Sequence, residues 1–252
     1  IYTLSLHDAL PISILAKAKD AAAFVKQETG SGNGVHIHSS GEQEAAHEAQ
    51  VAEQLQAALN DNLFKLAFQP IVSLRGDSGE HYEILLRMPD AEGNEISPTE
   101  FLQTASDKGL IAEIERWVIQ ESIFKLKDHL DKGHKTHTFI NLSAESLLDK
   151  SLLPWLSELL NQTRLPGDSI IFEVSETTAT AHLSESKEFV RGINQLHCKA
   201  ALTQFGRALN PFNNLKHLPV SYVKIDSSFI TEVNKNEGSK DEIKNLVSAL
   251  HA

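Results

Sequence analysis

The chain has 252 residues and a formal net charge of −11, from 23 lysines and arginines against 34 aspartates and glutamates. Such an acidic balance argues against a nucleic-acid polymer as partner, although one locally positive site can still take a small anion. The single cysteine, Cys198, excludes an intrachain disulfide framework and favours a reducing compartment, which we expect to be the cytoplasm. No apolar run reaches the roughly 18–20 residues of a membrane span.

The first 62 residues differ in character from the rest of the chain. Residues 1–13 carry no signal-peptide features and are interpreted as unassigned, foreign sequence. Residues 14–40 combine an alanine-rich helical pattern, a glycine-rich turn and a short alternating segment. Residues 41–62 are uninterrupted helix formers and predict a linker helix. Its narrow apolar face favours a connecting helix over a core helix and offers a surface for a homodimer, through Val51, Leu55 and Leu59.

From residue 63 onward, short apolar runs alternate with longer helical patterns, which is typical of βα units. The strand candidates are Phe64–Val72, Tyr82–Arg87, Thr138–Leu142, Ile170–Val174, Lys199–Thr203 and Tyr222–Ile225. The helix candidates are a segment opening at Phe101 after the capping box at 97–100, and Ile111–Lys132, Leu152–Thr163, Ser186–Leu196, Pro211–His217 and Asp241–His251.

Six strands in this order fit either an open doubly wound sheet or most of a barrel. The glycine fingerprint of a dinucleotide-binding sheet does not follow any of the strand candidates. Polar residues lie within or at the end of five strand candidates, which favours a (β/α)₈ barrel with its site at the carboxyl ends of the strands. These residues are Glu83, Asn141, Glu173, Gln204 and Lys224. Any one of them alone is better explained as a polar residue that ends a strand in water.

Several motifs follow one another in a fixed order along residues 63–252. They are Phe68–Val72 for F-Q-P-I-V, Tyr82–Arg87 for E-A-L-x-R with Ile84 in place of alanine, Phe139–Ser143 for N-x-S, Phe172–Glu176 for E-x-T-E, Phe205-Gly206 from D-D-F-G, and Leu218–Asp226 for L-P-V-D-x-x-K-I-D. By their order and spacing, this region resembles the EAL domain, the cyclic-di-GMP (c-di-GMP) phosphodiesterase module of bacteria. The resemblance implies a TIM-barrel-like α/β fold, truncated at its C-terminus and preceded by the linker helix. Residues 14–40 are similar to the tail of a GGDEF domain.

The resemblance also implies which residues carry the chemistry. Active EAL domains bind two cations through the carboxylates and the asparagine of these motifs, and the lysine of K-I-D positions or activates the water. Glu83, Asn141 and Glu173 are therefore the residual candidates for binding Mg or Mn, and Lys224 is the surviving family lysine. Thr203-Gln204 replaces both aspartates of D-D-F-G, and neutral side chains cannot hold two dications about 3.5–4 Å apart. The expectation is a domain that is not an enzyme and requires no cofactor.

An altered EAL motif together with lost aspartates most resembles the FimX-type regulators of type IV pili and twitching motility, whose EAL domain is a c-di-GMP receptor. Arg87 can contact a phosphate in bidentate fashion, while Leu85 and Phe205 can offer apolar faces to a guanine. In the alternative interpretation Arg87 pairs with a rim glutamate, and the two apolar residues only pack. The predicted ligand-binding residues are Gln69, Glu83, Leu85, Arg87, Asn141, Glu173, Phe205 and Lys224.

Three functions are compatible with this pattern. The first is a catalytically inactive c-di-GMP receptor that acts on pilus or motility output through a downstream signalling protein, for example of the PilZ type. The second is a weak Mg- or Mn-dependent c-di-GMP phosphodiesterase, and the third is a pure protein-interaction domain.

Two further features stand outside the ligand set. Glu176 matches a family glutamate that braces the loop after D-D-F-G, but that loop is altered here, which puts the role in question. His129, His134 and His137 lie close together in sequence without the spacing of a metal motif, so they are predicted to be solvated histidines.

Overall fold

The computed structural model describes residues 40–74, 76, 79–90, 93–96, 98–208, 211–233 and 237–251. The segment interpreted as foreign, most of the segment predicted to resemble a GGDEF tail and Ser97 of the predicted capping box lie outside the described residues. The described residues divide into two compact units: those within Phe64–Arg87 and Gly109–Ala252 belong to one, and those within Leu6–Leu63 and Met88–Lys108 belong to the other. None of the helices in the described part of the chain has the length and apolar character that crossing a membrane requires.

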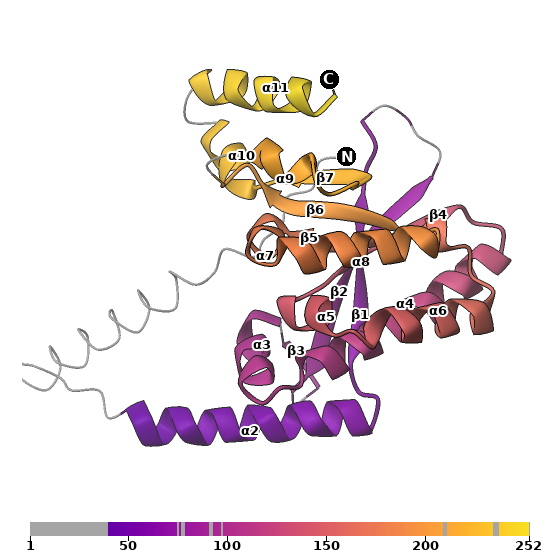
Figure 1. The fold of residues 1–252 in the computed structure, drawn as a ribbon. Coiled ribbons are helices and arrows are strands. Elements are labelled where there is room, and N and C mark those ends of the chain that lie inside the picture. The colour runs from indigo at the N-terminus through magenta and orange to yellow at the C-terminus, as the bar shows by residue number, and fades with distance from the viewer. Residues whose placement is uncertain are drawn as a thin grey trace, which may run out of the picture. The chain divides into compact units, whose positions relative to one another are not determined.

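The larger unit is built on a single sheet whose strands follow the order β1-β2-β4-β5-β6-β7. The strands are β1 (Lys65–Ile71), β2 (Glu80–Pro89), β4 (Thr136–Asn141), β5 (Ile170–Ser175), β6 (Lys199–Phe205) and β7 (Tyr222–Ile225). From β2 to β7 all neighbouring strands are parallel. All six predicted strands are present, and this parallel order with helices between strands confirms the predicted TIM-barrel-like α/β class (Figure 1).

The first strand departs from the βα pattern, because β1 pairs with β2 in the antiparallel direction. Parallel neighbours need a crossover of about a dozen residues or more. Only residues 72–79 separate β1 from β2, which is enough for a hairpin connection but not for a helix. One consequence of this register is that Gln69 lies directly across from Glu83.

Helices follow the parallel strands, and α4 and α8 pack against β4 and β6 (Figure 1). The helices of this unit are α4 (Ile111–Asp131), α5 (Ala144–Leu148), α6 (Leu152–Thr163), α7 (Glu176–Ala181), α8 (Leu183–Gln195), α9 (Pro211–Leu215), α10 (Ser227–Val233) and α11 (Glu237–His251). The short helices α5, α7 and α10 were not predicted, since five to seven residues contain too few turns for a helical period to be recognised.

A hydrophobic layer lies directly beneath the polar strand ends. Its members are Ile71, Phe139, Ile171 and Ala201, with Tyr222 packed against them. Side chains two positions apart on a strand share a face. Two positions after Phe139, Ile171 and Tyr222 come Asn141, Glu173 and Lys224, so the polar side chains stand on the same face as this layer.

The smaller unit contains α2 (Ser40–Asn60), the two-residue β3 (Glu95–Ile96) and α3 (Pro98–Asp107), and α2 packs against α3. Val51, Leu55 and Ala58 of α2 are buried, whereas Leu59 is only partly buried. The third buried residue of the apolar face of α2 is thus Ala58 and not the predicted Leu59. Two residues of the predicted dimer surface, Val51 and Leu55, are thus buried within the chain itself. Dimerisation stays a prediction.

Candidate functional site

Three buried ionisable side chains meet at the carboxyl ends of the parallel strands. Glu83, Glu173 and Lys224 come from β2, β5 and β7 and are 4%, 1% and 5% exposed. The Lys224 ammonium lies 3.1 Å from Glu83 Oε2 and also pairs with Glu173 Oε1. Asn141 of β4 donates a hydrogen bond from Nδ2 to Glu83 Oε1 at 3.2 Å. We call these four residues the rim cluster; the sequence predicted every one of them.

The rim cluster contains one more acid than base. Burial raises the pKa of Glu173, the Lys224 ammonium lowers it and the nearby charge of Glu83 raises it, and together these effects raise the pKa to about 7. When Glu173 carries a proton, the charges of Glu83 and Lys224 cancel. The Lys224 ammonium also lies 4.9 Å from the centre of the Phe139 ring, whose face favours a cation. The cluster is therefore close to neutral in its interior, although it is built from charged groups.

Two further predicted contact residues, Arg87 and Leu85, lie on β2 together with Glu83. Arg87 stands four positions after Glu83 on β2, on the same face, and both Arg87 and Leu85 are partly buried. Arg87 donates a hydrogen bond from Nη1 to the carbonyl of Leu86 at 2.7 Å. Within the described residues no carboxylate pairs with Arg87, so the alternative of a rim ion pair with Glu83 or Glu173 is not observed.

Phe205 does not present its ring at the rim. It is fully buried and packs edge-on against Phe212, with ring centroids 5.5 Å apart. The cause is local: Gln204 has a positive φ of 53°, and the pairing of β6 with β7 shifts register between Leu202 and Phe205. This kink directs Phe205 into the interior. In the described structure the Phe205 ring packs in the interior, and its predicted contact with a base stays a prediction.

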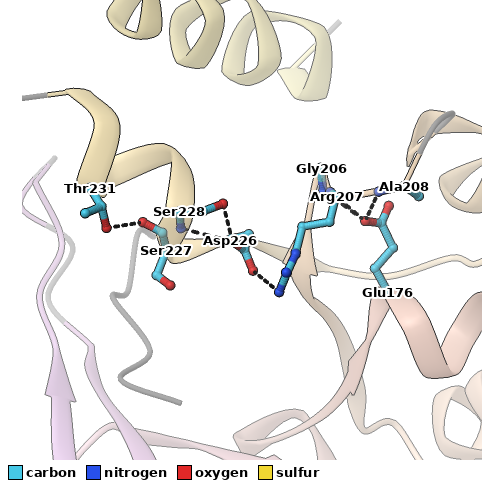
Figure 2. A network of polar contacts seen from close by, with 8 residues as sticks. All are labelled: Glu176, Gly206, Arg207, Ala208, Asp226, Ser227, Ser228 and Thr231. Atoms are coloured by element: carbon cyan, nitrogen blue, oxygen red, sulfur yellow. Dashed lines mark hydrogen bonds and ion pairs between the residues drawn. The ribbon is translucent and has the colours of Figure 1, made fainter. Parts of the chain in front are cut away.

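Glu176 braces the loop after β6. Its Oε2 atom accepts hydrogen bonds of 3.1 Å each from the backbone N–H groups of Gly206, Arg207 and Ala208 (Figure 2). Glu176 is 2% exposed, so this contact is shielded from water. The family contact predicted from the E-x-T-E motif thus exists here despite the altered loop sequence.

Asp226 ties the same loop to the chain after β7. The Arg207 guanidinium lies 3.7 Å from Asp226 Oδ2, and Ser228 donates from its backbone N–H and its hydroxyl to Asp226 Oδ1 (Figure 2). Asp226 is 3% exposed. The sequence analysis gave it no role, although its position directly after Lys224-Ile225 in the K-I-D motif was the available signal.

Comparison with known proteins places most of the chain in one family. Residues 52–252 match the family model described as the EAL domain. Among curated relatives, the cyclic di-GMP phosphodiesterase PdeF of Escherichia coli is 33% identical over 183 residues, which cover 73% of this chain and 24% of PdeF. The signaling protein YkoW of Bacillus subtilis is 28% identical over 197 residues, covering 78% of this chain and 25% of YkoW. The chain thus spans about a quarter of the length of these relatives.

Solved structures include similar EAL domains. The FimX EAL domain from Pseudomonas aeruginosa bound to c-di-GMP is 47% identical, with a TM-score of 0.76, over 80% of this chain and 81% of that one. The FimX EAL domain of Xanthomonas citri in complex with c-di-GMP is 27% identical, also with a TM-score of 0.76, over 82% of this chain and 81% of that one.

Proposed function

Because the chain belongs to the EAL domain family, we propose that it is a catalytically inactive receptor for c-di-GMP. Support for the ligand comes from the two FimX EAL domains, whose structures contain c-di-GMP and which share the fold over four fifths of this chain. Support for the absence of catalysis comes from the charges at the rim cluster.

The position of Lys224 is the observation that carries this proposal. A two-metal phosphodiesterase holds its cations about 3.5–4 Å apart, which requires several anionic oxygens free to coordinate them. Here Glu83 and Glu173 both face the Lys224 ammonium, and β6 contributes only the neutral Thr203 and Gln204 at this end of the sheet. We infer that the residues present do not fit a pair of Mg²⁺ or Mn²⁺ ions, and no hydrolytic step is assigned to them.

The same charge balance suits binding of an intact anion. Two ionised glutamates would repel a phosphate, but Lys224 compensates one charge, and the raised pKa of Glu173 favours a proton on the other. A protonated carboxyl can donate a hydrogen bond to the ligand. Among the described residues the Arg87 guanidinium binds a neighbouring carbonyl and no carboxylate, so it can make charge-assisted bonds to a phosphate. Amide groups for guanine or phosphate contacts come from Gln69 and Asn141, and Leu85 offers an apolar contact.

The output belongs to the same proposal. As the FimX-type resemblance implies, ligand occupancy would be passed to a downstream signalling protein in the cytoplasm and would affect pilus or motility function. Phosphodiesterase activity is the second candidate, and it is favoured by one observation, namely 33% identity to a relative named as a cyclic di-GMP phosphodiesterase.

Calorimetric titration of the chain with c-di-GMP, in Mg²⁺ and in EDTA, tests the proposal when chromatography of the same samples follows product formation. We expect saturable binding of similar affinity in both buffers and no linear pGpG. Sustained metal-dependent turnover would establish the phosphodiesterase instead. If neither binding nor turnover is detected, the pure interaction domain is the remaining function.

Substitution of Arg87 by alanine provides a residue-level check of the ligand contacts. Loss of charged hydrogen bonds worth about 1.5–3 kcal/mol should weaken c-di-GMP binding by about 10–100-fold. Stability should hardly change, because the hydrogen bond that Arg87 makes within the described structure goes to the adjacent carbonyl of Leu86. Arg191→Ala, at an exposed arginine of α8, is the matched control and should bind like the wild type. Equal affinity of the two variants would remove Arg87 from the site.

A further inference from the structure

We propose that Glu80, His129 and His134 form a binding site for a transition-metal ion of the Zn²⁺ class at the amino-terminal end of the sheet. Glu80 is the first residue of β2, His129 lies in the last turn of α4, and His134 lies in the turn before β4. The sequence analysis interpreted the two histidines as solvated because their spacing matches no metal motif. The third group comes from about 50 residues earlier in the chain, so spacing alone could not reveal the set.

The three side chains already converge. One ligand atom from each lies within 4.8 Å of the other two. His134 Nδ1 is 3.4 Å from Glu80 Oε1, and His129 Nδ1 is 3.7 Å from Glu80 Oε2. His129 Nδ1 also lies 2.8 Å from Thr136 Oγ1, a hydrogen bond that a metal at this nitrogen would replace. Tetrahedral Zn²⁺ with bonds of about 2.0–2.1 Å sets its ligand atoms about 3.3 Å apart. To reach that geometry the two rings must turn out of their parallel stack, so that each ring plane contains the metal.

The backbone around these residues is fixed by regular structure. Helix α4 ends at Asp131, and Gly133 reverses the chain with a φ of +89°, a conformation that suits glycine. The parallel register then sets Thr136 of β4 beside Glu80 of β2, and the Glu80 N–H donates to the Lys135 carbonyl at 2.8 Å. The helix end, the turn and the strand are thereby held at one place, as a preorganised site requires.

The polar neighbours of the three side chains also suit a metal. The rings of His129 and His134 are stacked, with centroids 3.9 Å apart and planes 6° from parallel. The hydroxyl of Thr136 donates to Glu80 Oε2 at 3.0 Å, which is the kind of outer contact that orients a coordinating carboxylate.

The donor set selects the class of ion. Imidazole nitrogens favour Zn²⁺, Ni²⁺ and Cu²⁺ over Mg²⁺ and Ca²⁺, which take oxygen ligands. Two histidines and one carboxylate leave a fourth position for water. His129 and Thr136 also line a pocket of about 340 Å³. A bound metal would link the end of α4 to the start of β2. Because it binds the folded state, it would raise the stability of the fold by mass action.

Titration of the full chain with ZnCl₂ tests the site, with calorimetry for stoichiometry and thermal unfolding for stabilisation. We expect about one equivalent to bind, with a rise in Tm, and both Glu80→Gln and His134→Ala to weaken binding at least tenfold. His81→Ala removes a histidine that stacks on His137 instead and serves as the matched control. A His36→Ala, His38→Ala double variant controls for the other closely spaced histidine pair.

The outcomes separate cleanly. Binding lost in the Glu80 and His134 variants and kept in both controls supports the site; Glu80→Gln alone suffices if His134→Ala does not fold. Absence of saturable zinc binding overturns the proposal. The proposal is also overturned if zinc binding survives in both site variants, or if zinc binding disappears in the His36/His38 variant. Because none of these readouts involves c-di-GMP, the result is independent of the receptor function.

Discussion

Because Lys224 lies between Glu83 and Glu173 with almost no solvent around any of the three, removing its charge leaves two buried carboxylates uncompensated. We expect Lys224→Met to lower the free energy of unfolding by about 3–5 kcal/mol, the usual cost of breaking a buried ion pair from one side. The loss should be larger at pH 8 than at pH 5, since acid protonates Glu173, whose pKa is already raised to about 7. Urea denaturation at both pH values measures the difference.

A compensating variant distinguishes charge from packing in this experiment. Adding Glu173→Gln to Lys224→Met removes one of the stranded carboxylates and should recover a large part of the lost stability at pH 8. If the double variant is as unstable as the single one, the loss comes from the missing lysine side chain's packing against Phe139 rather than from unpaired charge.

Glu115 of helix α4 holds the start of the short helix α5 through hydrogen bonds to Ser143. Its carboxylate accepts hydrogen bonds from the backbone N–H and the hydroxyl of Ser143, at 2.9 and 3.1 Å, at the start of α5. Burial raises the pKa of Glu115 to about 7, against the opposing effect of hydrogen bonds from Ser146 and Ser143. The folded state therefore keeps a proton that the unfolded chain loses at about pH 4.5.

The sign of this linkage gives a prediction. The contribution of the raised pKa of Glu115 to stability is fully present below pH 4.5 and is lost as the pH rises through about 7. Glu115→Gln should thus flatten the pH dependence of the urea midpoint between pH 4.5 and 7. Glu113→Gln, at an exposed position of the same helix, should follow the wild-type curve. Parallel curves for all three proteins would show that Glu115 titrates alike in the folded and unfolded states.

The loop after β6 depends on α7 in a similar way. Since one Glu176 oxygen accepts all three N–H groups of Gly206, Arg207 and Ala208, Glu176→Ala removes their common acceptor. Hydrogen exchange at these amides should accelerate by about 10–100-fold, corresponding to about 1.5–3 kcal/mol of lost protection. Glu176→Gln keeps one acceptor oxygen, so its amide exchange rates should lie between those of the wild type and of Glu176→Ala. Unchanged exchange in Glu176→Ala, matched to the exposed Glu185→Ala of α8, would assign the loop's order to Arg207 and Asp226 instead.

These elements show which parts of the molecule a sequence can reveal. The strands were predictable because short apolar runs ended in polar residues, and the family motifs placed Glu83, Asn141, Glu173 and Lys224 at one rim. For Phe205 the sequence left packing and ligand contact both open, because its position depends on a positive φ at Gln204 and on a register shift that no apolar period reveals. The convergence of Glu80 with His129 depends on the pairing of β2 with β4, which spacing along the chain does not encode.

Across the whole molecule, the net charge of −11 opposes the approach of an anionic ligand. Lowering the salt from 100 to 10 mM lengthens the range of this repulsion from about 10 to about 30 Å. If c-di-GMP is the ligand, its association rate constant should therefore rise modestly, about two- to fivefold, as salt increases over this interval, in contrast to an electrostatically steered encounter. Stopped-flow mixing with a fluorescent c-di-GMP analogue measures it. A steep fall in the rate with added salt would contradict this expectation and would mean that the local field of Arg87 and Lys224 outweighs the charge of the rest of the chain.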